Sequence, residues 1–440
     1  MNHKLYRLPL GATIIRIRTF ALYCPDLTRQ FPGLSFSIAK FSPFIVQPLA
    51  LSHYTVVSSL GRGMACTLAA LREGRSGLRR CDFMDAALDT YIGRVEGIED
   101  EPVVARLKDF DCRNNRLAMM GLVTDGFEAA VDAARIRYSP HRIAVVLGTS
   151  TSGILETELA YQHRDAEGKL PAYFNYRTTH ENYSVADFVR RYLKLRGPAL
   201  VISTACSSSA KAFASASRLI ENGLCDAAVV GGVDSLCLTT LCGFSSLEIV
   251  STAPCRPADA ERSGISIGEA AGFALVEKAA VRDDSICLLG YGESSDAYHM
   301  STPHPEGAGA RLAMSRALHR SGLDPSQIDC INLHGTATRA NDSAEDLAVS
   351  GLFGNLTPCS STKGWTGHTL GAAGITEAVI ACLCLREGLI PASLNTINVD
   401  PGFAMNVLLE NRQQPVRQVL SNSFGFGGNN VSLILGHPVQ

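Results

Sequence analysis

The sequence predicts an α/β protein whose sheets are mostly parallel and carry helices on their faces. Short apolar runs of strand length alternate with longer segments in which apolar residues recur at helical spacing. Several apolar runs end in glycine and hydroxyl residues, which is typical of strand-to-helix turns. No residue-level repeat of the solenoid kind interrupts this alternation, so we expect layered sheets.

Composition restricts the class of protein. The 440 residues suffice for two domains or one large duplicated one, and 40 basic against 42 acidic residues argue against nucleic acid as the main partner. The 14 cysteines include no Cys-x-x-Cys pair, so we expect reduced thiols and a cytoplasmic protein. The longest clean apolar run, 378–385, is too short for a membrane span of about 20 residues.

Residues 1–45 are predicted to be an N-terminal extension of the domain. Their basic side chains are opposed by the single acidic residue Asp26. Arg16 and Arg18 interrupt any apolar core of a secretory signal, so we expect no such signal.

The predicted elements alternate along the rest of the chain. In the first part these are a strand at 54–57, helices at 67–71 and 117–134, a strand at 143–147, a helical cap at 154–196, a strand at 199–202, a helix after 206, and strands at 226–232 and 272–276. In the second part these are a strand at 286–290, a helix at 310–321, a strand at 328–333, and helices at 343–352 and 369–385. Residues 81–110 are assigned to loops.

Cys206 lies on the turn between the predicted strand at 199–202 and the following helix. Ser207, Ser208 and Ser209 can cap that helix, and the positive end of the helix dipole favours a thiolate. The alternative is a cysteine that acts as a small hydrophobic residue, because free cysteine is among the most buried residue types. This turn alone leaves both interpretations open.

Three further turns carry groups capable of chemistry. They hold His334, the pair Lys363 and His368, and the pair Phe424 and Phe426. One cysteine and two histidines in such turns fit acyl transfer through a thioester. Taken singly, a histidine is more often structural and a lysine is a solvated charge.

We expect neither a metal nor a cofactor. His299 and His304 match no metal-ligand spacing, and the glycine-rich segments lack the established phosphate-binding patterns.

Together the four turns resemble those of the β-ketoacyl-[acyl carrier protein] synthases of the decarboxylating, elongating class (types I and II). The matching segments are Thr204-Ala-Cys-Ser-Ser208, His334-Gly-Thr-Ala-Thr338, Lys363-Gly-Trp-Thr-Gly-His368 with Leu370-Gly-Ala-Ala-Gly374, and Asn422-Ser-Phe-Gly-Phe-Gly-Gly428. They occur in the family's order, and the similarity extends from about residue 50 to the C-terminus.

The resemblance implies a thiolase-like fold, with two similar α/β halves in a five-layered αβαβα arrangement. We place the halves at 46–280, with Cys206, and at 281–440, with His334, Lys363 and His368. It also implies a homodimer or a heterodimer with a related subunit, and acyl- and malonyl-loaded acyl carrier protein as the partner.

By the same resemblance, Cys206 accepts an acyl group from the carrier protein, and His334 and His368 assist decarboxylation of the malonyl unit. The β-ketoacyl product would serve fatty acid, polyketide or related polyene biosynthesis. Lys363 is expected to support the histidines and to pair with Glu345. The remaining assignments are the N–H groups of Cys206 and Phe426 for the oxyanion hole, Phe424 and Phe426 for the gate, and Asp342, Glu345, Thr336 and Thr338 as supporting residues.

Some residues differ from the family pattern, and alternative classes of protein must be compared with it. Trp365, Arg339 and the segment Ser59-Leu-Gly61 differ from the family's usual residues and leave the acyl substrate open. A thiolase needs a second cysteine late in the chain, which 422–430 lacks, and initiating synthases use asparagine where His368 stands. The alternative from another class is a non-catalytic or weakly catalytic chain-length-factor-type subunit, which typically lacks the nucleophile.

Overall fold

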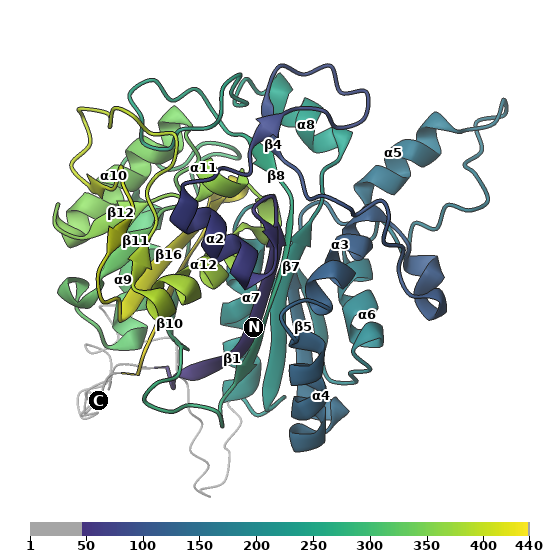
Figure 1. The fold of residues 1–440 in the computed structure, drawn as a ribbon, viewed down its shortest axis with the longest axis horizontal. Helices are drawn as coiled ribbons and strands as arrows, with labels where there is room; N and C mark the ends of the chain where they lie inside the picture. The colour runs from purple at the N-terminus through teal and green to yellow at the C-terminus, as the bar shows by residue number, and fades with distance from the viewer. Residues whose placement is uncertain (1–45, 439–440) are drawn as a thin grey trace, which may run out of the picture. The chain divides into compact units, whose positions relative to one another are not determined.

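A mixed sheet of 12 strands forms the centre of the protein (Figure 1). The computed structural model describes residues 46–438, so the predicted extension at 1–45 lies outside the described residues. The strands are β1 (Leu49–Ser58), β2 (Gly61–Arg62), β5 (Ile143–Gly148), β6 (Ala199–Ile202), β7 (Ala227–Asp234), β9 (Ala270–Glu277), β10 (Cys287–Ser295), β11 (Cys330–Asn332), β12 (Pro358–Ser360), β14 (Asn406–Val407), β16 (Gln418–Gly425) and β17 (Asn429–Gly436).

The strand order repeats within this sheet. One set runs β6-β5-β7-β9-β1 and the other runs β12-β11-β16-β17-β10, with β14 added at the edge. In each set the first strand in the sequence pairs with the last, and the third strand lies at the far end. The two sets meet where β1 pairs with β10 at Leu49↔Leu288 and Ala50↔Cys287.

The prediction of mostly parallel sheets is wrong, because parallel and antiparallel pairs occur together. In each set the outer three strands are parallel, and the two strands nearest the junction are antiparallel. Strands β16 and β17 are joined by the short turn η5 (Phe426–Gly428), and only antiparallel strands can be joined so tightly. The apolar runs predicted buried strands but carried no information about their direction.

Helices cover the two outer faces of the sheet and fill the space between its two sets. They are α2 (Met64–Glu73), α3 (Arg113–Leu122), α4 (Phe127–Tyr138), α5 (Ile154–Gln162), α6 (Tyr183–Tyr192), α7 (Ser208–Glu221), α8 (Leu238–Ser246), α9 (Ala308–Ser321), α10 (Arg339–Phe353), α11 (Lys363–Thr366) and α12 (Ala373–Glu387). The outer helices are α3, α4 and α6 on one face and α9, backed by α10, on the other. Helices α7 and α12 contact each other and strands of both sets, which completes five layers.

The central layer is closely packed. Residues 373–385 of α12 are buried on every side, as expected for a helix between two sheets. Helix α7 presents alanines at 210, 212, 214 and 216, and all four are buried. A Cβ atom on Gly374 would lie 2.5 Å from the backbone N of Ala210, so only glycine allows this approach.

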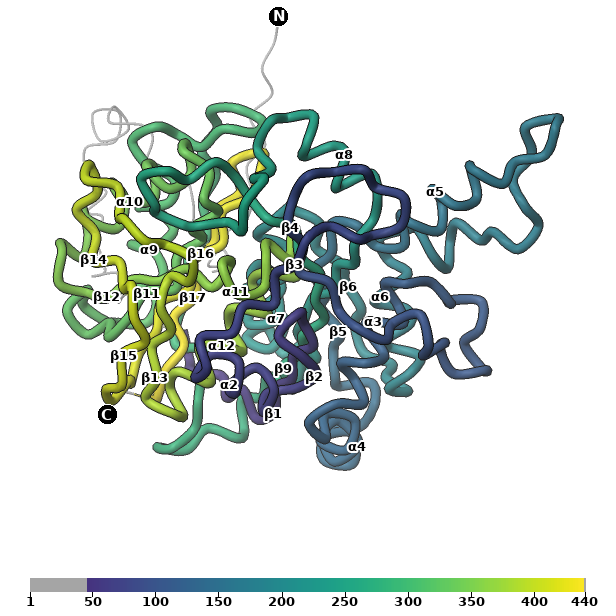
Figure 2. Tube along the Cα trace, turned by 45° about the horizontal axis from the view of Figure 1, so that its top comes forward, coloured from purple at the N-terminus to yellow at the C-terminus, as the bar shows by residue number. Residues whose placement is uncertain are grey.

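Three predictions about the first part need correction. The helix predicted at 117–134 is interrupted between α3 and α4, because Asp125 and Gly126 adopt left-handed backbone angles and Asp125 accepts a hydrogen bond from Thr55. The segment 154–196 is not a cap: α6 joins the outer layer, while α5 and the following loop extend away from the sheet (Figures 1 and 2). The predicted loops at 81–110 contain β4 (Tyr91–Gly93), which pairs with β3 (Arg79–Arg80) and β8 (Ile267–Gly268), and the 3-10 helix η1 (Ala105–Phe110).

Two further observations concern the described residues as a whole. Thirteen cysteines between residues 46 and 438 carry free thiols. No helix in this part of the chain is long and apolar enough to cross a membrane.

Candidate active site

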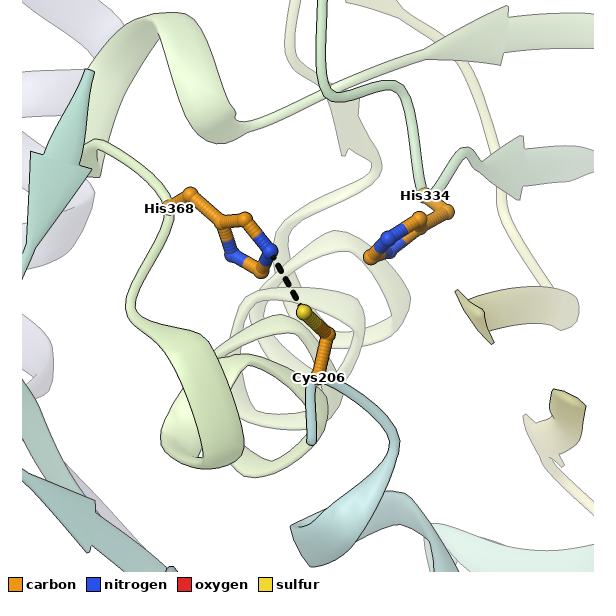
Figure 3. Close-up of side chains that lie close together, drawn as sticks. All are labelled: Cys206, His334 and His368. Atoms are coloured by element: carbon orange, nitrogen blue, oxygen red, sulfur yellow. Dashed lines mark hydrogen bonds between the residues drawn. The ribbon is translucent and has the colours of Figure 1, made fainter. Parts of the chain in front are cut away.

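A sharp turn between β6 and α7 presents Cys206 (Figure 3). The preceding residue, Ala205, has φ of 52°, a left-handed conformation that is unfavourable for a residue with a Cβ. The predicted serine caps are wrong: Ser207 Oγ donates to Thr204 O at 2.9 Å and Ser208 Oγ donates to Ala205 O at 2.6 Å. The serines therefore stabilise the turn instead of the helix N–H groups.

His368 lies closest to the thiol. Its Nε2 atom is 2.9 Å from Cys206 Sγ, and both residues are buried. His368 follows α11, and its own N–H donates to Ser266 O at 2.7 Å, which fixes the turn against the neighbouring segment. Sequence reasoning predicted both residues, and the structure brings them together.

His334 approaches the same sulfur from β11. The two imidazole rings are 5.4 Å apart between centroids and stand at 82° to each other. One ring nitrogen of each histidine and Cys206 Sγ lie within 4.8 Å of one another. Figure 3 shows the three side chains gathered in one place. Three turns that are far apart in the sequence thus meet at one point.

Lys363 contacts the Nδ1 atom of His334. Its Nζ atom is 3.4 Å from His334 Nδ1 and 2.6 Å from Glu377 Oε1, with both charged side chains buried. The predicted pairing of Lys363 with Glu345 is therefore wrong. Because an ammonium group has only donors, Lys363 makes His334 Nδ1 the acceptor and leaves the proton of the neutral ring on Nε2.

Glu345 has a different task. Its carboxylate accepts the backbone N–H groups of His334 and Gly335, each at 2.8 Å, and Nδ2 of Asn422 at 3.1 Å. Burial raises the pKa of Glu345 to about 7, although these donors act in the opposite direction. Glu345 therefore holds the turn that carries His334.

Asp342 lies near the start of α10, and Thr336 and Thr338 lie in the turn before this helix. Asp342 is buried and accepts the N–H of Ala258 at 2.8 Å, and burial raises its pKa. The hydroxyl groups of Thr336 and Thr338 are 2.9 Å apart, and both residues line the pocket above Cys206.

Electrostatics keep the central groups neutral. Burial, followed by the nearby Lys363 charge, lowers the pKa of His334 and of His368 well below the ordinary value of 6.5. Burial also raises the pKa of the Cys206 thiol to about 12, and Lys363 offsets this only in part. The expectation that the helix start favours a thiolate is therefore wrong, because the loss of solvation exceeds the lowering effects of Lys363 and of a backbone hydrogen bond on the thiol pKa.

A pocket of about 270 Å³ leads to these three side chains. Its lining includes the apolar residues Phe244, Leu247, Ile249 and Ile265 and the polar residues Thr336, Thr338, Asn341 and Asn430. Phe426 packs on Phe244 with 5.9 Å between ring centroids, and Phe424 lies 5.7 Å from the ring of His334. A pocket with both apolar and polar lining residues suits a flexible, amide-containing chain.

Sequence reasoning missed Glu377 and Asp234. Asp234, at the end of β7, is buried and accepts the N–H groups of Thr151 at 2.9 Å and Gly371 at 2.6 Å, together with the Thr149 hydroxyl at 2.6 Å. It therefore ties the loop after β5 to the turn three residues beyond His368. The available signal for both residues was an acidic side chain inside an otherwise apolar or small-residue segment, which needs a partner when buried.

Comparison with known proteins assigns the family. Two family models match: Beta-ketoacyl synthase, N-terminal domain, over residues 118–281, and Beta-ketoacyl synthase, C-terminal domain, over 286–397. A 3-oxoacyl-[acyl-carrier-protein] synthase 2 from Vibrio cholerae is 30% identical over 403 residues, which are 86% of this chain and 96% of the relative. The chain belongs to the β-ketoacyl synthase family. The resemblance seen in the four turns is confirmed.

Other relatives in the β-ketoacyl synthase family match over part of their length. A 3-oxoacyl-[acyl-carrier-protein] synthase 2 from Rhizobium meliloti is 41% identical, and the mitochondrial synthase of Arabidopsis thaliana is 40% identical, each over 259 residues. These matches span 61% and 56% of the two relatives.

Solved structures of β-ketoacyl synthases share the fold. A ketosynthase in complex with its chain length factor from Xenorhabdus doucetiae aligns with a TM-score of 0.81 and 39% identity, covering 89% of this chain and 98% of that one. A β-ketoacyl synthase from Burkholderia phymatum aligns with a TM-score of 0.78 and 27% identity, covering 90% and 100%. The predicted thiolase-like fold is confirmed.

Proposed function

We propose that this chain is a β-ketoacyl-[acyl carrier protein] synthase, which transfers an acyl group to Cys206 and then condenses it with a malonyl unit. The observation that carries the proposal is the convergence of Cys206, His334 and His368 at the end of one pocket. The product would be a β-ketoacyl thioester for fatty acid, polyketide or related polyene biosynthesis.

The first half-reaction is acyl transfer. His368 Nε2, 2.9 Å from Sγ, takes the thiol proton as Sγ attacks the thioester carbon of the donor. The new carbon–sulfur bond forms while the bond to the carrier thiol breaks, and the leaving thiolate receives the proton. We assign the oxyanion to the N–H groups of Cys206 and Phe426, and loss of one such donor typically costs about a hundred- to a thousandfold in rate.

The second half-reaction is decarboxylative condensation. His334 donates a hydrogen bond from Nε2 to the thioester oxygen of the malonyl group, and His368 does so after its ring proton has moved from Nδ1 to Nε2. The malonyl carboxylate leaves as carbon dioxide, and the bonding electrons form an enolate. The enolate carbon attacks the acyl-Cys206 carbonyl, the carbon–sulfur bond breaks, and the Cys206 thiolate regains a proton. Lys363 supports this step because it keeps the His334 proton on Nε2, toward the pocket.

The partner that we propose is acyl carrier protein, loaded first with the acyl group and then with malonate. The polar lining residues offer hydroxyl and amide groups to the amides of a flexible acyl-bearing arm, and the apolar lining residues accept its methylene groups. Phe424 and Phe426 are proposed to gate access to the acyl group. The names of the relatives, which are 3-oxoacyl-[acyl-carrier-protein] synthases, support this partner.

We also propose a dimer with an identical or related subunit, supported by a solved relative described as a ketosynthase in complex with its chain length factor. The second candidate function is that of a chain-length-factor-type subunit. The presence of Cys206 together with both histidines disfavours it. We further propose that the boundary between the two halves of the chain lies at 280/281. We also propose a cytoplasmic location, which the free cysteine thiols support.

Intact-mass spectrometry tests the proposal. Purified protein is incubated with a panel of acyl-loaded carrier proteins, and we expect the mass of one acyl group to be added. Peptide mapping should place this group on Cys206 in the unmodified chain, and Cys206→Ser should show no cysteine thioester. The exposed residues Cys66 and Cys242 provide the control, since replacing them with serine should leave acylation unchanged. No acyl-Cys206 with any donor would overturn the proposal.

A further inference from the structure

The side chains at the end of the pocket are also three metal-binding groups. Cys206 Sγ and one nitrogen each of His334 and His368 lie within 4.8 Å of one another, and all three residues are buried. We propose that this cluster binds one divalent ion of the zinc class, Zn²⁺ or Cd²⁺, which reversibly blocks Cys206. The ion acts as an inhibitor and not as a cofactor, and the proposal rests on donor geometry, independently of the proposed function.

The donor set suits a zinc-class ion. Thiolate and imidazole are the ligands that Zn²⁺ prefers, at about 2.3 Å from sulfur and about 2.0–2.1 Å from nitrogen. Donor atoms around such a tetrahedral ion are about 3.5 Å apart. The 2.9 Å between His368 Nε2 and Cys206 Sγ and the 4.8 Å limit for the group lie on either side of this value, so small side-chain rotations suffice.

The orientation of the rings also favours one shared ion. The imidazoles stand at 82° to each other, so they do not stack, and Figure 3 shows both rings directed toward Cys206 from separate turns. Three protein donors leave a fourth position toward the pocket, where water can bind. The same pocket gives the ion a path from solvent.

Binding changes the protons as well as the charge. When the metal–sulfur bond forms, the Cys206 proton is released to the buffer, and the reaction needs no oxidant or reductant. Lys363 Nζ donates a hydrogen bond to His334 Nδ1, so Nε2 is the His334 nitrogen that remains for the ion. The Nε2 proton must then move to Nδ1, and Lys363 loses its acceptor. Lys363 therefore opposes metal binding, although Glu377 at 2.6 Å offsets its charge.

This arrangement has a consequence for the free and the acylated protein. A sulfur that carries an acyl group cannot act as a thiolate ligand, so acylation and metal binding exclude each other. Zn²⁺ should inhibit only the free form, and a chelator should restore it.

The experiment uses the full chain after treatment with a chelator. Cd²⁺ is titrated while the ultraviolet thiolate-to-cadmium charge-transfer absorption is recorded, and Zn²⁺ is then added as a competitor. We expect one tight equivalent per chain, which is lost in Cys206→Ser and retained in the double variant Cys66→Ser/Cys242→Ser, because those exposed thiols lie outside the cluster. A signal that persists in Cys206→Ser would overturn the proposal.

Two further measurements test the metal site even if the Cys206→Ser variant does not fold. In the unmodified protein, Zn²⁺ should slow alkylation of Cys206 by iodoacetamide, read by peptide mass spectrometry, and equal labelling with and without Zn²⁺ would contradict the site. The Lys363→Met/Glu377→Leu double variant should bind Cd²⁺ about ten- to a hundredfold more tightly, which is the size, with the opposite sign, of the change usually caused by losing a contact that supports a metal ligand. Unchanged or weaker binding in a folded double variant would refute the opposing role of Lys363.

Discussion

The Nε2 atom of His368 lies 2.9 Å from the Sγ atom of Cys206, although 162 positions separate the two residues in the sequence. This contact pairs a thiol whose pKa is raised to about 12 with a neutral imidazole. The thiol is therefore activated by transfer of its proton during attack and not by a standing negative charge.

The first prediction concerns this proton transfer. His368→Ala should slow acylation of Cys206 by about a hundred- to ten-thousandfold, the usual contribution of a general base. His334→Ala should affect acylation less, because its ring does not make the closest contact with the sulfur. Single-turnover acylation followed by intact mass measures both rates, and equal losses in the two variants would argue against a distinct role for His368.

A second prediction separates the two half-reactions. Cys206→Gln replaces the thiol with a side chain that resembles the acylated cysteine, so decarboxylation of malonyl-carrier protein should continue without condensation. Release of carbon dioxide and formation of the acetyl-carrier product can be measured together. Adding His334→Ala or His368→Ala to this variant should abolish the release, and persistent release in both combinations would contradict the assignment of the histidines.

The third prediction concerns pH. Because burial, with a further contribution from Lys363, holds the pKa of His334 and of His368 well below 6.5, the acid limb of the acylation rate should lie well below pH 6.5. As the pH falls through about 6.5, the two histidines take up protons in the unfolded chain but not in the folded one. They therefore lower the free energy of unfolding below this pH and leave it unchanged above it.

A matched variant checks the cause of this shift. Lys363→Met removes the positive charge beside the rings, so the acid limb should move upward toward 6.5. Acylation rates between pH 4.5 and 8, in about half-unit steps, measure the position of the limb. An unchanged limb would show that burial alone sets these pKa values.

The fourth prediction concerns the buried pair of Lys363 and Glu377. Glu377→Ala leaves the buried ammonium group without its partner and should lower the free energy of unfolding by about 3–5 kcal/mol. Glu387→Ala on the same helix removes a more exposed partner of Arg72 and should cost about 0–1 kcal/mol. Denaturant unfolding compares the two variants, and similar losses would contradict the importance of the pair.

The fifth prediction concerns Asp234. Asp234→Ala leaves the buried donors of Thr149, Thr151 and Gly371 without an acceptor, each at a cost of about 1–3 kcal/mol. The variant should unfold at a lower temperature and acylate more slowly, because the turn that follows His368 loses its anchor. Asp226→Ala removes a surface partner of Arg142 and serves as the control, with little expected change in either measurement.

Much of the site was predictable because each reactive residue stands in a distinctive local pattern. Cys206 follows a short apolar strand at a run of small residues, and His334 follows another buried strand. Such turns place side chains at strand ends independently of the rest of the fold. Four of these turns in the family's order predicted the fold and the reactive groups. The apolar periodicity likewise predicted α7 and α9, since helical spacing is a local property.

The tertiary structure decided what depends on distant partners. No local pattern could reveal that Lys363 pairs with Glu377 instead of Glu345, because the choice follows from how α11, α12 and β11 pack. Strand direction was equally inaccessible, since a buried strand reads the same in either direction. The protonation of Cys206 was also a tertiary outcome: the sequence by itself determined a cysteine at a helix start, but only burial of that turn in the folded chain made desolvation exceed the lowering effect of Lys363 on the thiol pKa.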